Sequence, residues 1–537
     1  MKKNLLAASL ALALGSMSGV ASAALEVNTN GVGQINVLPY YSVQDSYNTL
    51  MTITNTDTVN GKAVKVRFRA AEWSDDALDF QVFLSPADVW TGAFGIVDGK
   101  LVLKTSDKSC TLPAALDGQE FTTIRVEGGS VDRLKEGYVE IITMADIPPK
   151  LNGVANVAAN RDNPLFTAVK HQNGVAPCGT TLTGLLENST NSRIIPLADA
   201  TAAGTSAETA ALATSQGSWM TDPTASLTSS ATVIAVSDSK AFTVPGVAIW
   251  GTAAADFNEV QYFRQANASF SLTAANANSL TADRLFWPVN DGATPPVALF
   301  GTAYPVYQFD LPDLSTPFNG GTATDWRDDL ALELQKSVLA SDYVISPSIQ
   351  ASTDIVLSQP VRRYFYTYAA DTTTPSVEGT TFNRTIRNVK YLVSGEADTP
   401  YELLTKSNQV EIGAPTFWDR EERTFVSSSD IVVSPQEPGV DAQYFLKGEV
   451  SVVSIKHGAG VTGALGARLT NVDWSFAQDY TSGWLTLNTV AQNVTVAAPY
   501  TTGALPVVGF TAINIFNAGA GAAGTNYGQV LPLRVLP

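Results

Sequence analysis

The chain has 537 residues, of which 45% are apolar and only 15% are charged, and its formal net charge is −17. A strongly acidic chain lacks the cationic face that binds phosphate, so we expect no nucleic-acid partner. Cations suit so many carboxylates better. The length predicts two to four domains, with enough apolar side chains to fill their cores.

The first 23 residues have the layout of a secretory signal peptide. Lys2 and Lys3 precede an apolar stretch from Leu5 to Leu14, and small residues close the segment at Ala21-Ser22-Ala23. We therefore expect export, and loss of the two lysines changes the net charge from −17 to −19. An apolar stretch of this length is shorter than the roughly 20 residues that a membrane-spanning helix needs, and no later stretch is long enough, so we expect no transmembrane segment.

Short strands separated by turn residues fill the first part of the mature chain, residues 24–197. We expect strands at Gln34 to Tyr41, Tyr47 to Asn55, Ala63 to Arg69, Asp79 to Leu84, Phe121 to Glu127 and Gly137 to Met144. Between Val64 and Phe68 apolar and basic residues alternate, which predicts one buried face and one wet face. The pattern favours a mainly β protein built of antiparallel, immunoglobulin-like β-sandwich domains with a few short helices.

The two cysteines, Cys110 and Cys178, both lie in the mature region. An even count in an exported protein predicts a disulfide bond, which would contribute on the order of 4 kcal/mol to stability. The alternative is a pair of free thiols or metal ligands. His171 is the only histidine nearby, and two cysteines with one histidine do not complete a tetrahedral zinc site.

Composition changes in the middle of the chain. Residues 198–232 are rich in Ala, Thr and Ser, which is typical of a linker or surface segment, and residues 233–537 are expected to form a β-rich region of one or two domains. Apolar residues at i, i+4 spacing predict one helix from Asp325 to Leu339. Further strands are expected at Arg362 to Tyr368, Val389 to Val393, Thr424 to Val433, Gln443 to Ser454, Trp484 to Val490 and Val507 to Ile513.

Residue patterns that carry catalysis are scarce. The only two histidines, His171 and His457, have no supporting motif, and we expect them at the surface or in turns. The run Gly519 to Gly524 has the glycine spacing of a dinucleotide-binding loop, but it lacks a downstream acid, so we expect a surface loop. We therefore do not expect an enzyme; the remaining enzymatic alternative is a glycosidase that uses Glu421 and Glu422.

Two acidic clusters are candidates for binding Ca²⁺, a cation that carboxylate and backbone oxygens hold. The first consists of Asp75, Asp76 and Asp79, next to a tryptophan, and the second of Asp419, Glu421 and Glu422. The second cluster also contains arginines, and mixed charges of this kind favour a solvated, salt-bridged loop. Calcium binding is therefore a hypothesis based on acidity and export.

Several phrases resemble one family of exported proteins. They are Asn36 to Tyr40, Tyr47 to Leu50, Ile53 to Thr56, Asp79 to Pro86, Glu136 to Ile142, Trp418 to Glu422 and Leu505 to Phe510. Together they are similar to the S-layer proteins of marine gammaproteobacteria, over most of the mature chain. The resemblance implies a subunit of a two-dimensional lattice on the Gram-negative outer membrane that can also be shed on vesicles. It implies contacts with other copies and, through divalent cations, with lipopolysaccharide, and it supplies no catalytic residues.

The main alternative is an exported adhesin or glycan-binding protein. The aromatic run Arg363-Tyr364-Phe365-Tyr366 would line a glycan site if it were exposed, although such runs more often fill the core beneath a strand.

Overall fold

A computed structural model gives the structure of the chain. It describes residues 25–123, 126, 129–151, 161–179, 182, 220–263, 265, 281–282, 311–370, 384–389, 409–425, 431–433, 444–457, 463–469, 471–476, 480–492, 496, 499–519 and 524–536. The expected signal peptide, residues 198–219 of the expected linker and residues 520–523 of the glycine run lie outside this description.

Two facing sheets form the first β-sandwich. The seven-stranded sheet has the order β1 (Leu25–Val27), β14 (Val247–Gly251), β2 (Ile35–Ser42), β9 (Glu136–Ile147), β4 (Gly61–Ala70), β5 (Asp76–Leu84), β8 (Cys110–Leu112). The five-stranded sheet has the order β13 (Lys240–Pro245), β12 (Leu227–Ala235), β3 (Asn48–Asn55), β6 (Val89–Val97), β7 (Lys100–Lys104). Aromatic side chains join the sheets: the rings of Phe68 and Phe94 are 4.9 Å apart, and those of Phe80 and Trp90 are 5.5 Å apart.

The first sandwich includes chain from beyond residue 197. Strand β12 pairs with β3 through the whole register from Leu227↔Asn55 to Ile234↔Asn48, and β14 pairs with β2. The end of the expected linker, from Leu227 to Thr232, is therefore part of a strand. The outward residues Thr228, Ser230 and Thr232 alternate there with buried residues, which is a half-buried strand pattern. The buried residues are Leu227, Ser229, Ala231 and Val233.

The second half forms another pair of sheets. One has the order β21 (Thr424–Phe425), β20 (Gln409–Asp419), β26 (Ser482–Ala491), β16 (Val338–Val344), β30 (Arg534–Val535), and β23 (Tyr444–Lys447) also pairs with β20. The other has the order β22 (Ile431–Val433), β25 (Asn471–Phe476), β24 (Val450–His457), β17 (Ser352–Ser358), β28 (Val508–Asn517), β29 (Thr525–Pro532). All of these pairs are antiparallel except β24 with β25. The ring of Phe417 on the first sheet lies 6.4 Å from that of Trp474 on the second.

Smaller elements complete the fold. Three two-stranded sheets pair β10 (Lys150–Leu151) with β11 (Arg161–Asp162), β15 (Gln335–Lys336) with β27 (Leu505–Pro506), and β18 (Tyr366–Ala370) with β19 (Arg384–Val389). Among the described residues, the helices are α2 (Pro164–Val169), α7 (Ala323–Leu334) and the 3-10 turns η1 (Val131–Leu134), η2 (Ala254–Phe257), η6 (Pro347–Ile349) and η7 (Arg362–Phe365). The helices described are too short or too polar to cross a membrane.

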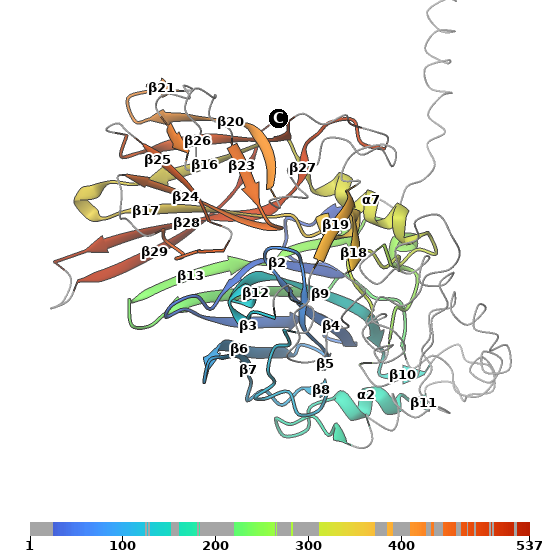
Figure 1. Cartoon of the computed structure of the whole chain (residues 1–537). Helices are drawn as coiled ribbons and strands as arrows, with labels where there is room; N and C mark the ends of the chain where they lie inside the picture. Colours follow the sequence, from blue (N-terminus) through green and yellow to red (C-terminus); the bar gives the residue numbers. More distant parts are fainter. Residues whose placement is uncertain are drawn as a thin grey trace, which may run out of the picture.

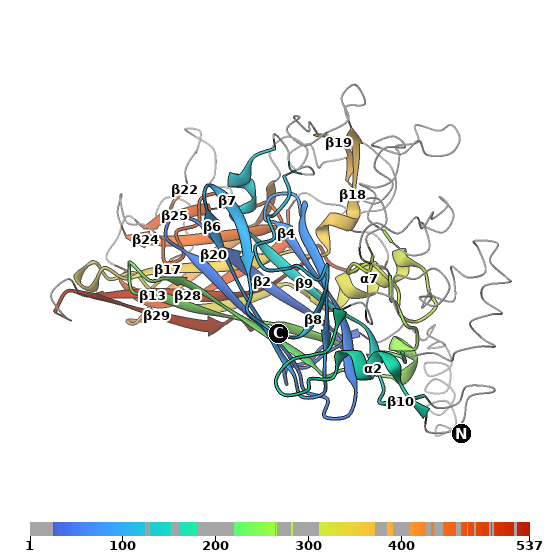
Figure 2. The same cartoon turned by 90° about the horizontal axis from the view of Figure 1, so that it is seen from below.

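The second sandwich is stacked on the first, as Figure 1 shows. Strands β17 and β28 contact β2, and β29 lies beside β13. Seen from below in Figure 2, α2 and α7 lie at the end of the molecule opposite to the β28–β29 hairpin. One continuous group of buried apolar side chains runs through both sandwiches, from Leu25 to Ala512. The two halves therefore share a core.

The mainly β prediction is confirmed, and so is the disulfide: Cys110 and Cys178 are bonded, with their Cα atoms 5.4 Å apart. The expected central strand at Val507 to Ile513 is β28, which lies between β17 and β29. The aromatic run at Tyr364 and Phe365 is buried, as core-filling side chains are.

Several local predictions were wrong. The expected strand Arg362 to Tyr368 starts as the 3-10 turn η7, and β18 begins only at Tyr366. The expected strand Gln443 to Ser454 is divided into β23 and β24, which lie in different sheets. The described residues of the expected strand Phe121 to Glu127 are not in a strand. The expected helix ends at Leu334, because Gln335 pairs with Pro506 and Val338 begins β16. The face of Val64 to Phe68 that was expected to be wet is buried, since every residue of β4 is buried.

Candidate functional site

Strand β4 carries the basic residues of a buried ionic cluster between the two sandwiches. Because side chains alternate along a strand, Lys65, Arg67 and Arg69 share one face of the seven-stranded sheet, opposite Val66 and Phe68 in the sandwich core. The three basic side chains are between 0% and 2% exposed. Protein rather than water therefore covers this face.

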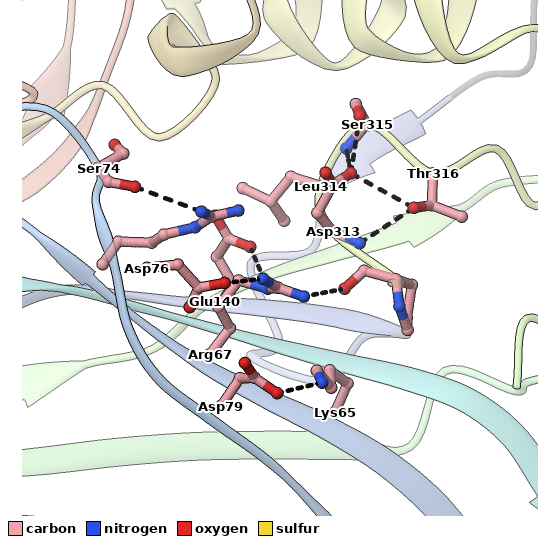
Figure 3. Close-up of polar contacts among 12 residues, drawn as sticks. Lys65, Arg67, Ser74, Asp76, Asp79, Glu140, Asp313, Leu314, Ser315 and Thr316 are labelled. Carbon is pink, nitrogen blue, oxygen red and sulfur yellow. Dashed lines mark hydrogen bonds and ion pairs between the residues drawn. The ribbon is translucent and has the colours of Figure 1, made fainter. Parts of the chain in front are cut away.

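The neighbouring strands supply acids to the same face. Arg67 lies opposite Asp79 on β5 and opposite Glu140 on β9. The Nε atom of Arg69 donates a hydrogen bond to Oε1 of Glu140 at 3.0 Å, and Nε of Arg67 lies 3.8 Å from Oε2 of the same carboxylate. Figure 3 shows this group, including the ion pairs of Arg67 with Asp76 and of Lys65 with Asp79.

Residues far along the chain close the cluster from the other side. Arg67 donates from Nη2 to the carbonyl oxygen of Pro312 at 3.3 Å. The hydroxyl of Tyr364, on η7, donates to Oε1 of Glu140 at 3.5 Å and accepts from the N–H of Leu314 at 3.1 Å. These contacts tie β4 and β9 to the segment before α7 and to the second sandwich.

Asp313 stabilises the segment that reaches Arg67. Its Oδ1 accepts from the N–H of Ser315 at 2.8 Å and from the Ser315 hydroxyl at 2.7 Å, and its Oδ2 accepts from the hydroxyl of Thr281 at 2.9 Å. Figure 3 shows the turn that results, with Thr316 closing it. The turn fixes the position from which Pro312 presents its carbonyl group.

Glu449 is a second buried acid at the boundary between the sandwiches. It lies directly before β24, and its N–H donates to the carbonyl oxygen of Ala71 in the first sandwich at 2.8 Å. Burial raises the pKa of its carboxyl group to about 7, against the effect of the Arg362 and Arg363 guanidinium groups. Arg363 in turn donates from Nη1 to the carbonyl oxygen of Trp73 at 2.8 Å. Glu449 and Arg363 therefore both contact the loop after β4.

Glu136, the first residue of β9, makes a third link. Its Oε2 accepts from the backbone N–H of Leu469 at 2.9 Å and of Arg468 at 3.3 Å, while the hydroxyl of Tyr40 donates to Oε1 at 2.9 Å. Burial raises the pKa of Glu136, and the backbone N–H of Leu469 opposes that rise. Nearby, the hydroxyl of Tyr47 donates to the carbonyl oxygen of Ala464 at 2.8 Å.

These contacts make the boundary an interlocked polar joint. Burial also raises the pKa of Glu140, although Arg69 and Arg67 lower it. Removing charges from water costs several kcal/mol per ion, and a buried pair compensates only when its geometry and hydrogen bonds are complete. Such a joint favours one relative placement of the sandwiches, because any other would break the hydrogen bonds that Arg67, Glu140 and Glu136 make across the boundary. The groups of the joint fix the two sandwiches relative to each other. They are buried and are not arranged as an exposed nucleophile and base.

The first candidate calcium site belongs to this joint. Asp76 pairs with Arg67 and Asp79 with Lys65, and Asp75 is buried beside them in the chain. A calcium ion would have to displace these basic side chains. Among the described residues, no group of three or more His, Cys, Asp or Glu side chains is arranged to hold a metal ion.

The second candidate calcium site is the turn between β20 and β21. Oδ1 of Asp419 accepts from the N–H groups of Glu421 at 2.8 Å and Arg423 at 2.9 Å, and Nε of Arg423 donates to Oδ2 at 2.6 Å. Glu421 and Glu422 are exposed. The carboxylates of this cluster therefore do not converge, and the turn is salt-bridged.

One histidine contacts a turn, and the other ends a strand. Nδ1 of His171 lies 2.9 Å from the hydroxyl of Ser85 and 3.3 Å from Oδ2 of Asp88, at the turn between β5 and β6. His457 is the last residue of β24.

The joint was not predicted from the sequence, although the sequence contains a charge pattern that indicates it. Lys62, Lys65, Arg67 and Arg69 all lie within one ten-residue strand, and Glu136 and Glu140 occupy alternate positions of another. Opposite charges on neighbouring strands with the same alternation are typical of paired strands. Only the contribution of the second half, more than 200 residues away for Pro312 and Tyr364, could not be inferred from that pattern.

Comparisons with family models, curated proteins and solved structures gave no match for this chain.

Proposed function

We propose that this protein is an exported structural subunit that assembles with copies of itself into a two-dimensional surface layer on the outer membrane of a Gram-negative cell. The observation that carries the proposal is the polar joint. A lattice repeats one geometry many times, so its subunit must keep its parts in a fixed relative position. Glu140, Glu449 and Glu136 each make a buried contact between the first sandwich and the second half of the chain.

The sequence supports the same function. The expected leader directs export, and the phrases that resemble S-layer proteins run through both sandwiches. Acidic copies repel one another, so divalent cations are proposed to bridge surface carboxylates to lipopolysaccharide phosphates and to neighbouring copies.

Electron microscopy tests the proposal. Protein collected from outside the cells would be purified, dialysed with Ca²⁺ or with a chelator, and imaged in negative stain. Ordered sheets with a constant lattice spacing support a surface-layer subunit. Dispersed particles under both conditions would contradict it. Sheets that form equally well in chelator would reject the calcium requirement alone.

One observation favours a second function, that of a glycan-binding surface protein. Trp418 on β20 and Trp484 on β26 lie opposite each other, with their rings stacked at 3.9 Å and an interplanar angle of 7°, and Trp484 is 37% exposed. Indole faces pack against the apolar faces of sugars. The exposed ion pair of Asp342 with Arg534 lies next to Trp484 and offers hydrogen-bonding groups.

A pull-down on immobilised glycans separates the two functions. Trp484→Ala should abolish retention if the tryptophan pair binds sugars, whereas Tyr527→Ala, which removes an exposed aromatic ring elsewhere, should not. If the glycan resin retained neither the wild type nor the variants, glycan binding would be rejected.

A further inference from the structure

The outer face of the five-stranded sheet carries no charge over four adjacent strands. The outward residues are Asn48, Leu50, Thr52 and Thr54 on β3; Val89, Thr91 and Ala93 on β6; Thr228, Ser230, Thr232 and Ile234 on β12; and Ala241, Thr243 and Pro245 on β13. We call these residues the neutral face. None of them is acidic or basic, although the chain contains 50 Asp and Glu residues.

The strand registers place the neutral face in rows across the sheet. One row runs Thr91, Thr52, Ser230 and Pro245, and the next runs Ala93, Leu50, Thr232 and Thr243. Leu50 is 45% exposed and Val89 is 43% exposed. The surface is therefore an array of hydroxyls and apolar groups.

Charges begin at the edge of the neutral face. The outermost strand on one side, β7, has exposed Lys100 and Lys104, and Lys104 lies opposite Ala93. On the other side, the strand beside β13 is β29, which has no charged residue either. An uncharged centre with a charged rim is the composition of protein–protein interfaces, in which charged residues are depleted at the core.

We infer that the neutral face is a lattice contact, at which it packs on the neutral face of a second copy across a two-fold axis. This inference rests on the proposed function and deepens it by naming the surface and its partner. Copies of the mature chain, with a net charge of −19, repel each other, and the repulsion is weakest where neither surface carries charge. Threonine and serine hydroxyls both donate and accept hydrogen bonds, so two identical faces can satisfy each other.

The size of the face fits a lattice contact better than a free dimer. Four strands about 4.8 Å apart and four rows of alternating residues span roughly 15 by 20 Å. That footprint is below the approximately 800 Å² per partner of a typical stable complex. The contact is therefore weak alone, and it acts together with the other contacts that each subunit makes in a layer.

Charge substitutions test the inference. The variant Thr52→Lys/Thr91→Lys places two lysines on a cross-strand pair of the neutral face, and Thr52→Glu/Thr91→Glu places two acids there. Each variant alone should lose ordered sheets, because like charges meet across the two-fold axis. An equimolar mixture should recover them, because lysines then face glutamates. Thr416→Lys/Thr486→Lys is the matched control, a cross-strand threonine pair on the outer face of the β20–β26 sheet, and it should assemble like wild type.

The outcomes separate this inference from the proposed function. If either Thr52/Thr91 variant formed sheets on its own, the inference would be overturned while the surface-layer function would stand. If the control variant also lost its sheets, the inference would be overturned in the same way. Loss in both variants without recovery in the mixture would show that the face meets a different surface, which also overturns it. Failure of the wild type to form sheets would instead count against the proposed function. Equal melting temperatures for all variants would show that folding is not the cause.

Discussion

Two sheet faces of the first sandwich distribute charge in opposite ways. The face of β4, β5 and β9 toward the second half carries Lys65, Arg67, Arg69 and Glu140, and it is buried. The neutral face of β3, β6, β12 and β13 carries no charge, and its residues are exposed or half-buried. A sheet in a monomeric protein usually shows the reverse, with charges outward and apolar residues inward.

The difference shows what each face contacts. A buried charge is tolerated only where a partner is always present, and here the neighbouring strands supply the ionic partners while Pro312 and Tyr364 add hydrogen bonds from the later part of the chain. Most side chains of the neutral face are exposed or half-buried in the part of the chain that the structure describes. Its composition suits a surface that meets water at one time and another protein surface at another, since desolvating hydroxyls and methyl groups costs far less than desolvating ions.

The largest expected effect comes from breaking the buried face. Arg69→Met removes a cation that pairs with Glu140 and leaves that carboxylate buried beside fewer partners. We expect a loss of about 3–5 kcal/mol in the free energy of unfolding, measured by urea denaturation of the exported protein. The control is Lys100→Met, whose pair with Glu120 is 59% and 52% exposed and should change stability by less than about 1 kcal/mol. Equal effects would contradict the account of the joint.

The disulfide compares covalent with ionic stabilisation on the same sheet. Cys110 lies on β8, the edge strand of the seven-stranded sheet, and the bond spans 68 residues. Replacing both cysteines with serine should lower the free energy of unfolding by about 4 kcal/mol, because the unfolded chain gains freedom. Urea denaturation of this variant beside Arg69→Met measures both losses. A loss below about 1 kcal/mol would mean that neighbouring contacts already restrict this loop.

Stability should depend on pH through Glu449. Its pKa is raised from 4.5 to about 7 in the folded protein, so the folded state binds the proton more tightly than the unfolded state does. The resulting stability is complete below pH 4.5 and is lost as the pH rises to about 7. The loss is on the order of 3 kcal/mol for this group.

Glu449→Gln isolates that effect, because glutamine does not titrate. Urea denaturation at pH 5 and pH 7 should show a smaller difference for the variant than for the wild type. The raised pKa values of Glu140, Glu136 and Asp146 act in the same direction, so some dependence should remain. Identical pH dependence in both proteins would refute the assignment to Glu449.

The smallest effect on stability is expected on the neutral face. Thr52→Lys/Thr91→Lys changes two outward side chains without buried charges, so the free energy of unfolding should change by less than about 1 kcal/mol. A loss as large as that of Arg69→Met would show that the neutral face contributes to folding rather than to contacts between copies.

Local patterns in the sequence predicted the mainly β class, the positions of many strands and the disulfide. The alternation from Val64 to Phe68 correctly separated two faces, but the sequence does not show what covers the second face, and Pro312 and Tyr364 come from far along the chain. The helix expected to reach Leu339 ends at Leu334 for the same kind of reason, because pairing with β27 and β26 overrides local spacing. Pairing with β3 likewise places part of the Ser- and Thr-rich segment in a strand.

The two candidate calcium sites were predicted from the acidic residues alone, without the basic side chains that pair with them. The carboxylates of Asp76 and Asp79 are used by Arg67 and Lys65 on the neighbouring strand, and the sequence separation between them gave no direct sign of this. The neutral face was equally hidden, because its four strands come from residues 48–97 and 227–245. Only the strand registers bring those outward residues together.

Electron cryotomography of intact cells that make the protein in quantity tests the central claim most directly. A regular lattice on the outer membrane, lost when the coding sequence is deleted and restored by the wild-type chain, is the predicted result. A bare outer membrane on cells that export the protein abundantly would contradict the account.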